Sequence, residues 1–187
     1  MPLFAINAKK KLEAVQQSSF SIERELQQLV ESSLESVFQC RFVASELPTN
    51  FQRGGRMYTL GLSEAGNPVI IEFKRSDSSK LVTQNNHYRA WIHDHCADIE
   101  GAVRKALGSH VDVNWDDVRL ICLAPSYKKF DLYAMQAGSV ELWSYRLFAN
   151  QTLYLEKLQQ NLSFSASIER IASHKHSSRA GTGKKLH

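Results

Sequence analysis

Apolar residues recur at steps of three and four along the segment from residue 21 to residue 38. The repeating positions are Ile22, Leu26, Leu29, Val30, Leu34, Val37 and Phe38. This spacing predicts one amphipathic helix of about five turns, with its apolar stripe on a sheet. Ser19 or Ser21 is expected to be its N-cap, and Glu23 and Glu25 fall in the first turn, where the helix dipole favours carboxylates.

The period then changes to the alternation that is typical of strands. Residues 40–47 (CRFVASEL) predict a strand, and Gly55 to Arg75 predict a β-hairpin with its turn at residues 64–67 (EAGN). Strand alternation sends neighbouring residues of the second arm to opposite faces. One face receives Val69, Ile71 and Phe73, and the other receives Ile70, Glu72 and Lys74.

Further elements are expected in the second half of the chain. They are helices over 81–95, 97–107 and 127–136, and strands over 118–124, 140–147 and 152–158. The continuous apolar run VRLICLA at 118–124 predicts a strand that is buried on both faces and central in the sheet. Trp91 and Ile92 are expected in the core. Together these elements predict an α/β domain of three layers, with a central mixed β-sheet flanked by helices.

The length of 187 residues and the 43% apolar content fit one domain with irregular ends. We expect an N-terminal arm over 1–20, the α/β domain over 21–160 and a basic, flexible tail over 161–187. The net charge of +4 arises in residues 163–187, which hold five Lys or Arg residues and one Glu, so the remainder is neutral. A neutral body disfavours tight nonspecific DNA binding. The run Lys9-Lys10-Lys11 fits either an arm or a charged strand edge.

The three cysteines, Cys40, Cys96 and Cys122, are widely spaced in apolar surroundings, which indicates reduced packing residues. His93 and His95 do not fit a zinc site on a helix, because side chains two residues apart point about 200° apart. The sequence has no long apolar span, and its first residues lack the order of a secretory signal. These features predict a cytoplasmic protein that does not enter a membrane.

Two polar residues end the apolar second arm of the predicted hairpin. Glu72 and Lys74 are separated by Phe73 in the run PVIIEFKR. A carboxylate and an ammonium at the end of such a strand are costly to bury unless they pair or serve a site. Spacing alone leaves both interpretations open: a salt-bridged strand end, or part of a functional site.

The surroundings of this run resemble the PD-(D/E)XK nuclease superfamily. The run PVIIEFKR is preceded by GR-hydrophobic-x-TLG at residues 55–61 and followed by Gln84 and Tyr88 in QNNHYRAWI. The chain looks most like a small bacterial endonuclease-like group, and the resemblance extends from about Ser21 to about Leu158. It implies a restriction-endonuclease-like fold and hydrolysis of DNA phosphodiesters with Mg²⁺ or Mn²⁺.

The resemblance also implies roles for individual residues. Glu72 and the backbone carbonyl of Phe73 would be metal ligands, and Lys74 would be the catalytic lysine. Gln84 would lie against that lysine. The early helix of such nucleases points a glutamate toward the metal, and Glu31 matches that position, with Glu25 as the second choice.

One position departs from the family pattern, because Tyr58 stands where the metal-binding aspartate is expected. A phenol, with a pKa near about 10, does not replace a carboxylate at neutral pH. The metal is therefore expected to be weakly held or absent, unless another carboxylate substitutes. Glu46 and Asp77 are near in sequence, whereas Glu64 lies at the hairpin tip and is expected to be remote from Glu72.

Two functions follow as alternatives. The first is a nuclease-fold protein that interacts with DNA and, if active, is a Mg²⁺-dependent endonuclease. The second is a catalytically inactive relative that serves as a binding or scaffold protein, in which Tyr58 fills the cleft beside Glu72. The sequence leaves the oligomeric state open, a homodimer included.

Overall fold

The computed structural model describes residues 2–48, 56–75, 90–136 and 140–159. Gln84, Asp77, most of the helix predicted over 81–95 and the predicted tail lie outside these ranges. The described end of that helix, residues 90–94, is helical, and Trp91 and Ile92 are buried as predicted.

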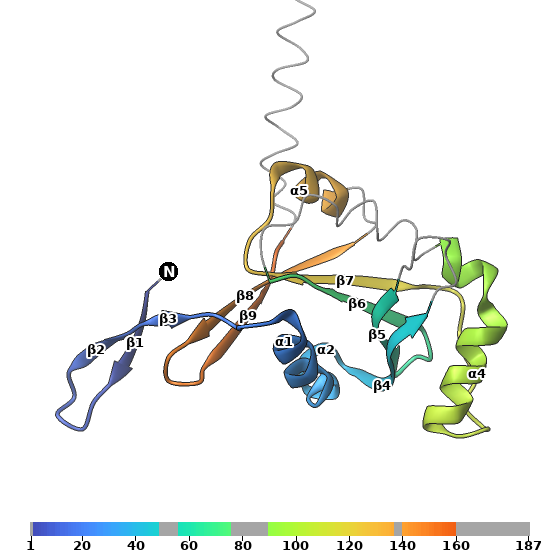
Figure 1. Ribbon diagram of the computed structural model, residues 1–187, viewed down its shortest axis with the longest axis horizontal. Helices are drawn as coiled ribbons and strands as arrows, with labels where there is room; N and C mark the ends of the chain where they lie inside the picture. Colours follow the sequence, from blue (N-terminus) through green and yellow to red (C-terminus); the bar gives the residue numbers. More distant parts are fainter. Residues whose placement is uncertain (1, 49–55, 76–89, 137–139, 160–187) are drawn as a thin grey trace, which may run out of the picture.

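A mixed sheet forms the centre of the molecule (Figure 1). Within the described residues it has seven strands. In spatial order they are β3 (Gln17–Ser18), β8 (Glu141–Phe148), β7 (Arg119–Ala124), β6 (Pro68–Phe73), β5 (Arg56–Ser63) and β4 (Cys40–Pro48), with β9 (Leu153–Lys157) paired to β8. The pairs β6–β7 and β7–β8 are parallel and the others antiparallel, which confirms the predicted mixed sheet.

Helices cover both faces of this sheet (Figure 1). The first face carries α1 (Glu23–Glu31) and α2 (Leu34–Phe38), whose apolar residues form one core cluster with the sheet. The second face carries α4 (Cys96–Leu107) and α5 (Lys129–Gln136), which contribute to another cluster. The described chain is therefore the predicted arrangement of three layers. None of its helices has the length and apolar character needed to cross a membrane.

Strand β6 is buried along its whole length between β5 and β7. Ile71 and Phe73 belong to the cluster under α1, whereas Ile70 belongs to the cluster under α4. This confirms the predicted alternation and the predicted hairpin, since β5 and β6 pair antiparallel with Thr59 opposite Ile71. The alternation decides on which face each site residue lies.

The single helix predicted over residues 21–38 is wrong, because the structure divides it into α1 and α2. The hydroxyl of Ser32 donates to the carbonyl oxygen of Leu29 at 2.7 Å, and Ser33 has a non-helical φ of −131°. Serine side chains compete for backbone hydrogen bonds in this way and interrupt helices. The expected N-cap also differs, because the cap is Ile22.

The N-terminal residues form a separate hairpin of β1 (Leu3–Ile6) and β2 (Leu12–Val15). Lys10 has a φ of 57° and closes its turn, and the Asn7 side chain accepts hydrogen bonds from the backbone N–H groups of Lys9 and Lys11. This turn resembles the three-residue hairpin loop that ends in a left-handed residue. The lysine run therefore lies at the tip of a folded arm.

An ion-pair network joins the strands at the amino end of β7. The Arg119 guanidinium donates to both carboxylate oxygens of Glu141 at 3.0 and 3.3 Å, and Lys157 lies 2.9 Å from the same carboxylate. Arg119 also donates to the carbonyl oxygen of Phe38. Burial alone would raise the pKa of Glu141, but the hydrogen bonds from Arg119 and Lys157 outweigh it and lower the pKa to about 2.

This network predicts a loss of stability in acid. Because the folded-state pKa of Glu141 lies below its ordinary 4.5, the contribution is present above pH 4.5 and disappears as the pH falls toward 2. We expect Glu141→Gln to cost about 1 to 2 kcal/mol at pH 7, allowing for solvent screening of these half-buried groups, and little at pH 2. Urea unfolding across this pH range measures it. Glu156→Gln, at an exposed position of β9, is the control. It should leave the free energy of unfolding unchanged at both pH 7 and pH 2.

Gly101 lies inside α4, and a Cβ placed there would meet nothing within 4 Å. Gly101→Ala is therefore expected to raise the free energy of unfolding by about 0.5 to 1 kcal/mol, because alanine loses less backbone entropy in a helix. A shift of the urea midpoint at constant slope measures this change. At Gly61 the same substitution should be destabilising, because its Cβ would lie 2.9 Å from the Cys40 Sγ atom.

Candidate functional site

The polar pair of the apolar strand lies at the carboxyl end of β6. Glu72 is fully buried, with 0% of its surface exposed, and its Oε1 atom lies 2.6 Å from the Nζ atom of Lys74. The Lys74 side chain is 20% exposed, whereas the Glu72 side chain is not exposed at all. The carboxyl ends of adjacent parallel strands are where α/β sheets most often bind ligands.

Glu72 lies on the face of the sheet that α4 and α5 cover. Its register partner is Cys122 on β7, which in turn is paired with Leu142 on β8, and both belong to the cluster under α4. The Tyr127 hydroxyl lies over these strands within hydrogen-bond distance of the carbonyl oxygens of Cys122 and Trp143, at 2.7 and 2.8 Å. Burial raises the pKa of Tyr127, so the phenol stays protonated and remains a donor.

Sequence reasoning did not select Tyr127 as a site residue. Its position shortly after Pro125, which follows the buried strand, was the available signal, since loops at the carboxyl ends of parallel strands line sites in such sheets. Tyr127 packs against the cluster under α4, so it lies on the same face of the sheet as Glu72.

The backbone after Glu72 is anchored from both sides. The Lys74 N–H donates to the carbonyl oxygen of Leu123 at 2.9 Å, and the Tyr145 hydroxyl donates to the Lys74 carbonyl oxygen at 3.3 Å. The Arg75 N–H donates to the carboxylate of Glu23 at 3.1 Å, and the Arg75 guanidinium donates to the Ser21 carbonyl oxygen. The start of α1 therefore fixes the strand end that presents Lys74.

Glu31 lies on the other face. Its Oε1 atom accepts hydrogen bonds from the Thr59 hydroxyl at 2.5 Å and from the Gln27 side chain at 3.0 Å. Thr59 is the register partner of Ile71, which packs under α1, so Glu31 is bound to the α1 face of the sheet whereas Glu72 belongs to the α4 face. The structure does not bring these two carboxylates together.

Phe73 and Glu25, which the sequence analysis also named, lie in different surroundings. The Phe73 side chain is fully buried under α1, so only its backbone lies between Glu72 and Lys74. Glu25 is exposed at the start of α1 and accepts hydrogen bonds from the N–H and hydroxyl of Ser21, which lower the pKa of its carboxyl group.

The structure also places Tyr58, Glu64 and Glu46, which the sequence analysis considered at the metal site. The backbone of Tyr58 lies in β5, but its side chain falls outside the described residues. Glu64 is exposed at the turn between β5 and β6, remote from the carboxyl end of β6, as expected. Glu46 lies in β4 with a positive φ of 51°.

The described ligand atoms at the carboxyl end of β6 do not fit a Mg²⁺ site. Mg²⁺ demands near-octahedral oxygen coordination and is usually held by one or two carboxylates together with water and phosphate. Glu72 meets the ammonium of Lys74, and Glu31 is on the opposite face. No cluster of three or more His, Cys, Asp or Glu residues suited to a metal forms within the described ranges. Further ligands would have to come from outside them, where Asp77 lies.

Several cations follow the carboxyl ends of the two central strands. Arg75 comes directly after Lys74, and the exposed Lys128 and Lys129 follow β7 at the start of α5. The Asp131 carboxylate, which is buried, accepts a hydrogen bond from the Lys128 N–H at 2.9 Å and so fixes this helix start. We call Lys74, Arg75, Lys128 and Lys129 the basic edge.

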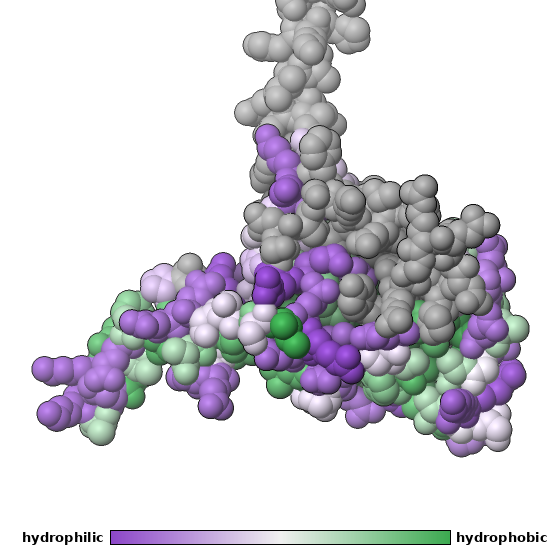
Figure 2. Space-filling model, in the orientation of Figure 1, coloured by the Kyte–Doolittle hydropathy of each residue, from purple (hydrophilic) through white to green (hydrophobic). Residues whose placement is uncertain are grey.

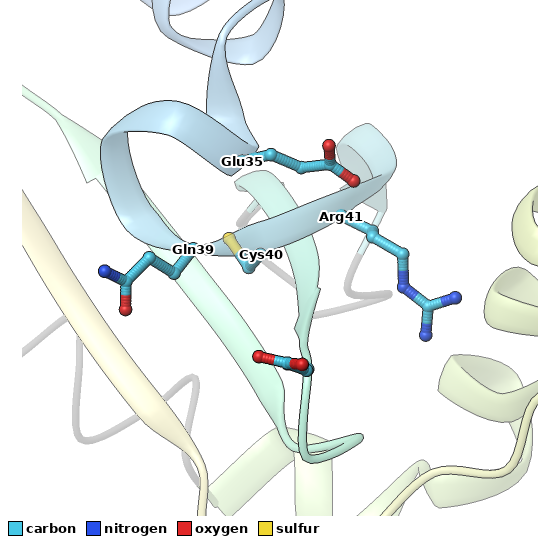
Figure 3. Close-up of a pocket in the computed structure, with 5 residues that line it drawn as sticks. Glu35, Gln39, Cys40 and Arg41 are labelled. Atoms are coloured by element: carbon cyan, nitrogen blue, oxygen red, sulfur yellow. The ribbon is translucent and has the colours of Figure 1, made fainter.

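A hollow of about 540 Å³ lies at the opposite end of the sheet. It is lined by Glu35, Gln39, Cys40, Arg41 and Glu64, and Gln39 and Arg41 extend to opposite sides of Cys40 (Figure 3). Burial raises the pKa of the Cys40 thiol to about 11, against the smaller opposing effect of Arg119. The thiol is therefore protonated at neutral pH and is a poor nucleophile. Glu31, Glu72 and Lys74 do not line this hollow.

Comparison with known proteins gives relatives of limited similarity. No family model matches the chain. A protein of Haemophilus influenzae described as uncharacterized is 26% identical over 173 residues, which cover 89% of this chain and 56% of the relative. The chain therefore spans little more than half the length of that relative.

The chain is also similar to solved structures of endonucleases. A repair endonuclease from Pyrococcus abyssi gives a TM-score of 0.41 at 17% identity over 68% of this chain and 48% of that one. EndoMS in complex with double-stranded DNA gives 0.44 at 20% identity over 70% and 48%, and EndoMS in its apo form gives 0.43 at 20% identity over 71% and 52%. These overlaps are partial, and the activities in those descriptions are those of the proteins named.

Proposed function

We propose that this is a nuclease-fold protein that binds DNA along the basic edge. The observation that carries the proposal is the Glu72–Lys74 pair, which ends a fully buried strand and leaves the lysine side chain partly exposed. Burying a carboxylate costs free energy even when it is paired, so a structural role alone is an expensive use of this position. The resemblance of PVIIEFKR to the PD-(D/E)XK pattern supports the same assignment.

The basic edge supplies the charge that such binding needs. Lys and Arg side chains that neutralise phosphates release counterions, and this release provides most of the affinity for DNA. Arg75, Lys128 and Lys129 are exposed, whereas Lys74 is partly neutralised by Glu72. The DNA affinity that these few cations provide is moderate, and it falls as the salt concentration rises.

Hydrolysis of the bound phosphodiester is the finer part of the proposal. A divalent cation such as Mg²⁺ would need further ligands from outside the described residues, and it would then supply positive charge at the phosphate and activate a water. Glu72 is the described carboxylate that would contribute to such a site, and it forms an ion pair with Lys74. We propose that Mg²⁺ or Mn²⁺ is at most weakly held, because the described residues at this edge lack a complete set of ligands.

A binding protein without nuclease activity is the second candidate. Two observations favour it: Glu31 lies on the opposite face from Glu72, and the Glu72 carboxylate is engaged by Lys74. The combination is consistent with a sheet edge braced by an ion pair. Both candidates share DNA binding at the basic edge and differ only in cleavage.

Metal calorimetry and plasmid nicking, applied to the same preparations, separate the two candidates. We expect the wild type to bind Mn²⁺ and Mg²⁺ weakly, and Tyr58→Asp to strengthen binding by restoring a carboxylate at the family position. Nicking by the wild type that Glu72→Gln abolishes would establish the enzyme. If neither the wild type nor Tyr58→Asp binds metal or nicks DNA, the nuclease assignment is wrong and the binding protein remains.

A further inference from the structure

The N-terminal hairpin exposes an apolar face. Antiparallel register pairs Phe4 with Ala14 and Ile6 with Leu12, and strand alternation places these four side chains on one face. Phe4 is 48%, Ile6 73% and Leu12 67% exposed, and Ala14 is exposed as well. A two-stranded hairpin is at best marginally stable alone in water. We therefore expect these apolar side chains to pack against another protein surface.

Within the part of the chain that the structure describes, no other element covers this face. Gln16 alone separates β2 from β3, which pairs with Leu147 and Phe148 of β8, and the Gln16 carbonyl oxygen accepts a hydrogen bond from the Ala149 N–H. The root is thus fixed to the sheet edge, and the arm extends away from the body (Figure 1). Green and purple residues both lie along the arm in Figure 2.

A complementary surface lies on α1. Ile22 is the N-cap residue of α1 and Leu29 lies in its last turn, and they are 54% and 45% exposed. The exposed Glu25 lies between them, and Glu35 follows on α2. The hairpin tip carries three exposed lysines, Lys9 to Lys11, beside the apolar face. Apolar area and opposite charge thus match on the two surfaces.

We propose that two copies of the chain exchange their arms, each hairpin packing its apolar face on the Ile22–Leu29 stripe of the other copy. A two-fold axis makes both contacts at once, because each copy supplies one hairpin and one stripe. The lysine tip then meets the acidic surface of α1 and α2. The phosphates of DNA are a poorer match for this face, since its cations are confined to the tip.

Sedimentation of the full chain tests the exchange. The wild type should be a dimer, and Ile6→Glu and Leu29→Glu should each weaken dimerisation by at least about 100-fold, because each removes an apolar side chain from both contacts. Ala5→Lys alters the other face of the same strand, opposite Glu13, and should leave the dimer intact. Circular dichroism shows whether each variant keeps the fold.

Mixing the two variants gives the sharpest result. In an exchanged dimer of Ile6→Glu with Leu29→Glu, both changes fall in one contact and the other contact is wild type, so dimers should reappear on mixing. A monomeric wild type would overturn the proposal, as would dimers that survive either substitution. A monomer whose DNA affinity falls in Ile6→Glu would also overturn it and assign the face to nucleic acid.

Discussion

Lys74→Met is expected to lower the free energy of unfolding by about 2 to 4 kcal/mol, because it removes the ammonium beside a fully buried carboxylate. The Nζ atom lies 2.6 Å from Oε1 of Glu72, and methionine keeps most of the length of the side chain but none of its charge. Urea denaturation at pH 7 measures the loss.

A double variant separates charge from packing. Adding Glu72→Leu to Lys74→Met removes both charges from the strand end, and it should recover most of the lost stability, since buried ion pairs are often replaced by apolar residues at little cost. Lys105→Met on α4 is the matched control, because that lysine is exposed. If Lys74→Met lowers the free energy of unfolding no more than Lys105→Met does, the Lys74 ammonium does not stabilise the buried Glu72 carboxylate.

Phe73→Ala is expected to cost about 3 to 5 kcal/mol, the range for removing a fully buried aromatic side chain and leaving a cavity. Phe73 has no exposed surface and packs in the cluster that joins β6 to α1. The loss should appear as a lower midpoint of unfolding by urea, with an unchanged slope.

Phe42→Ala supplies the control for this substitution. Phe42 lies in β4, at the edge of the sheet, and 41% of it is exposed, so the same chemical change should cost less than about 1 kcal/mol. Equal losses at the two positions would contradict the assignment of β6 as a central strand.

Periodicity was sufficient for most of the fold. The continuous apolar run at 118–124 correctly predicted the central strand β7, and alternation in 69–74 correctly assigned the two faces of β6. The interruption at Ser32 and Ser33 was missed, because apolar residues keep their helical spacing across it. The N-terminal hairpin was left open, since its turn depends on Asn7 contacts and on a left-handed Lys10 without the usual glycine.

The candidate site was only partly accessible to sequence reasoning. The contact of Glu72 with Lys74 follows from strand spacing, because residues two apart share a face. The location of Glu31 does not, since it depends on the pairing of Thr59 with Ile71, a contact between distant segments. Tyr127 was missed for a different reason, because its hydroxyl contacts the backbone carbonyl oxygens of β7 and β8, which side-chain patterns do not reveal.

The affinity for a short DNA duplex, measured at several salt concentrations, decides whether the basic edge binds DNA. Lys128→Glu/Lys129→Glu reverses two exposed charges of the basic edge, and Arg104→Glu/Lys105→Glu reverses two on α4 as a control of equal charge. We predict that fluorescence anisotropy shows a loss of at least about tenfold for the first variant, a shallower dependence on salt, and a smaller change for the control. Equal losses in the two variants, or no DNA binding by the wild type, would contradict a DNA site at the carboxyl ends of β6 and β7.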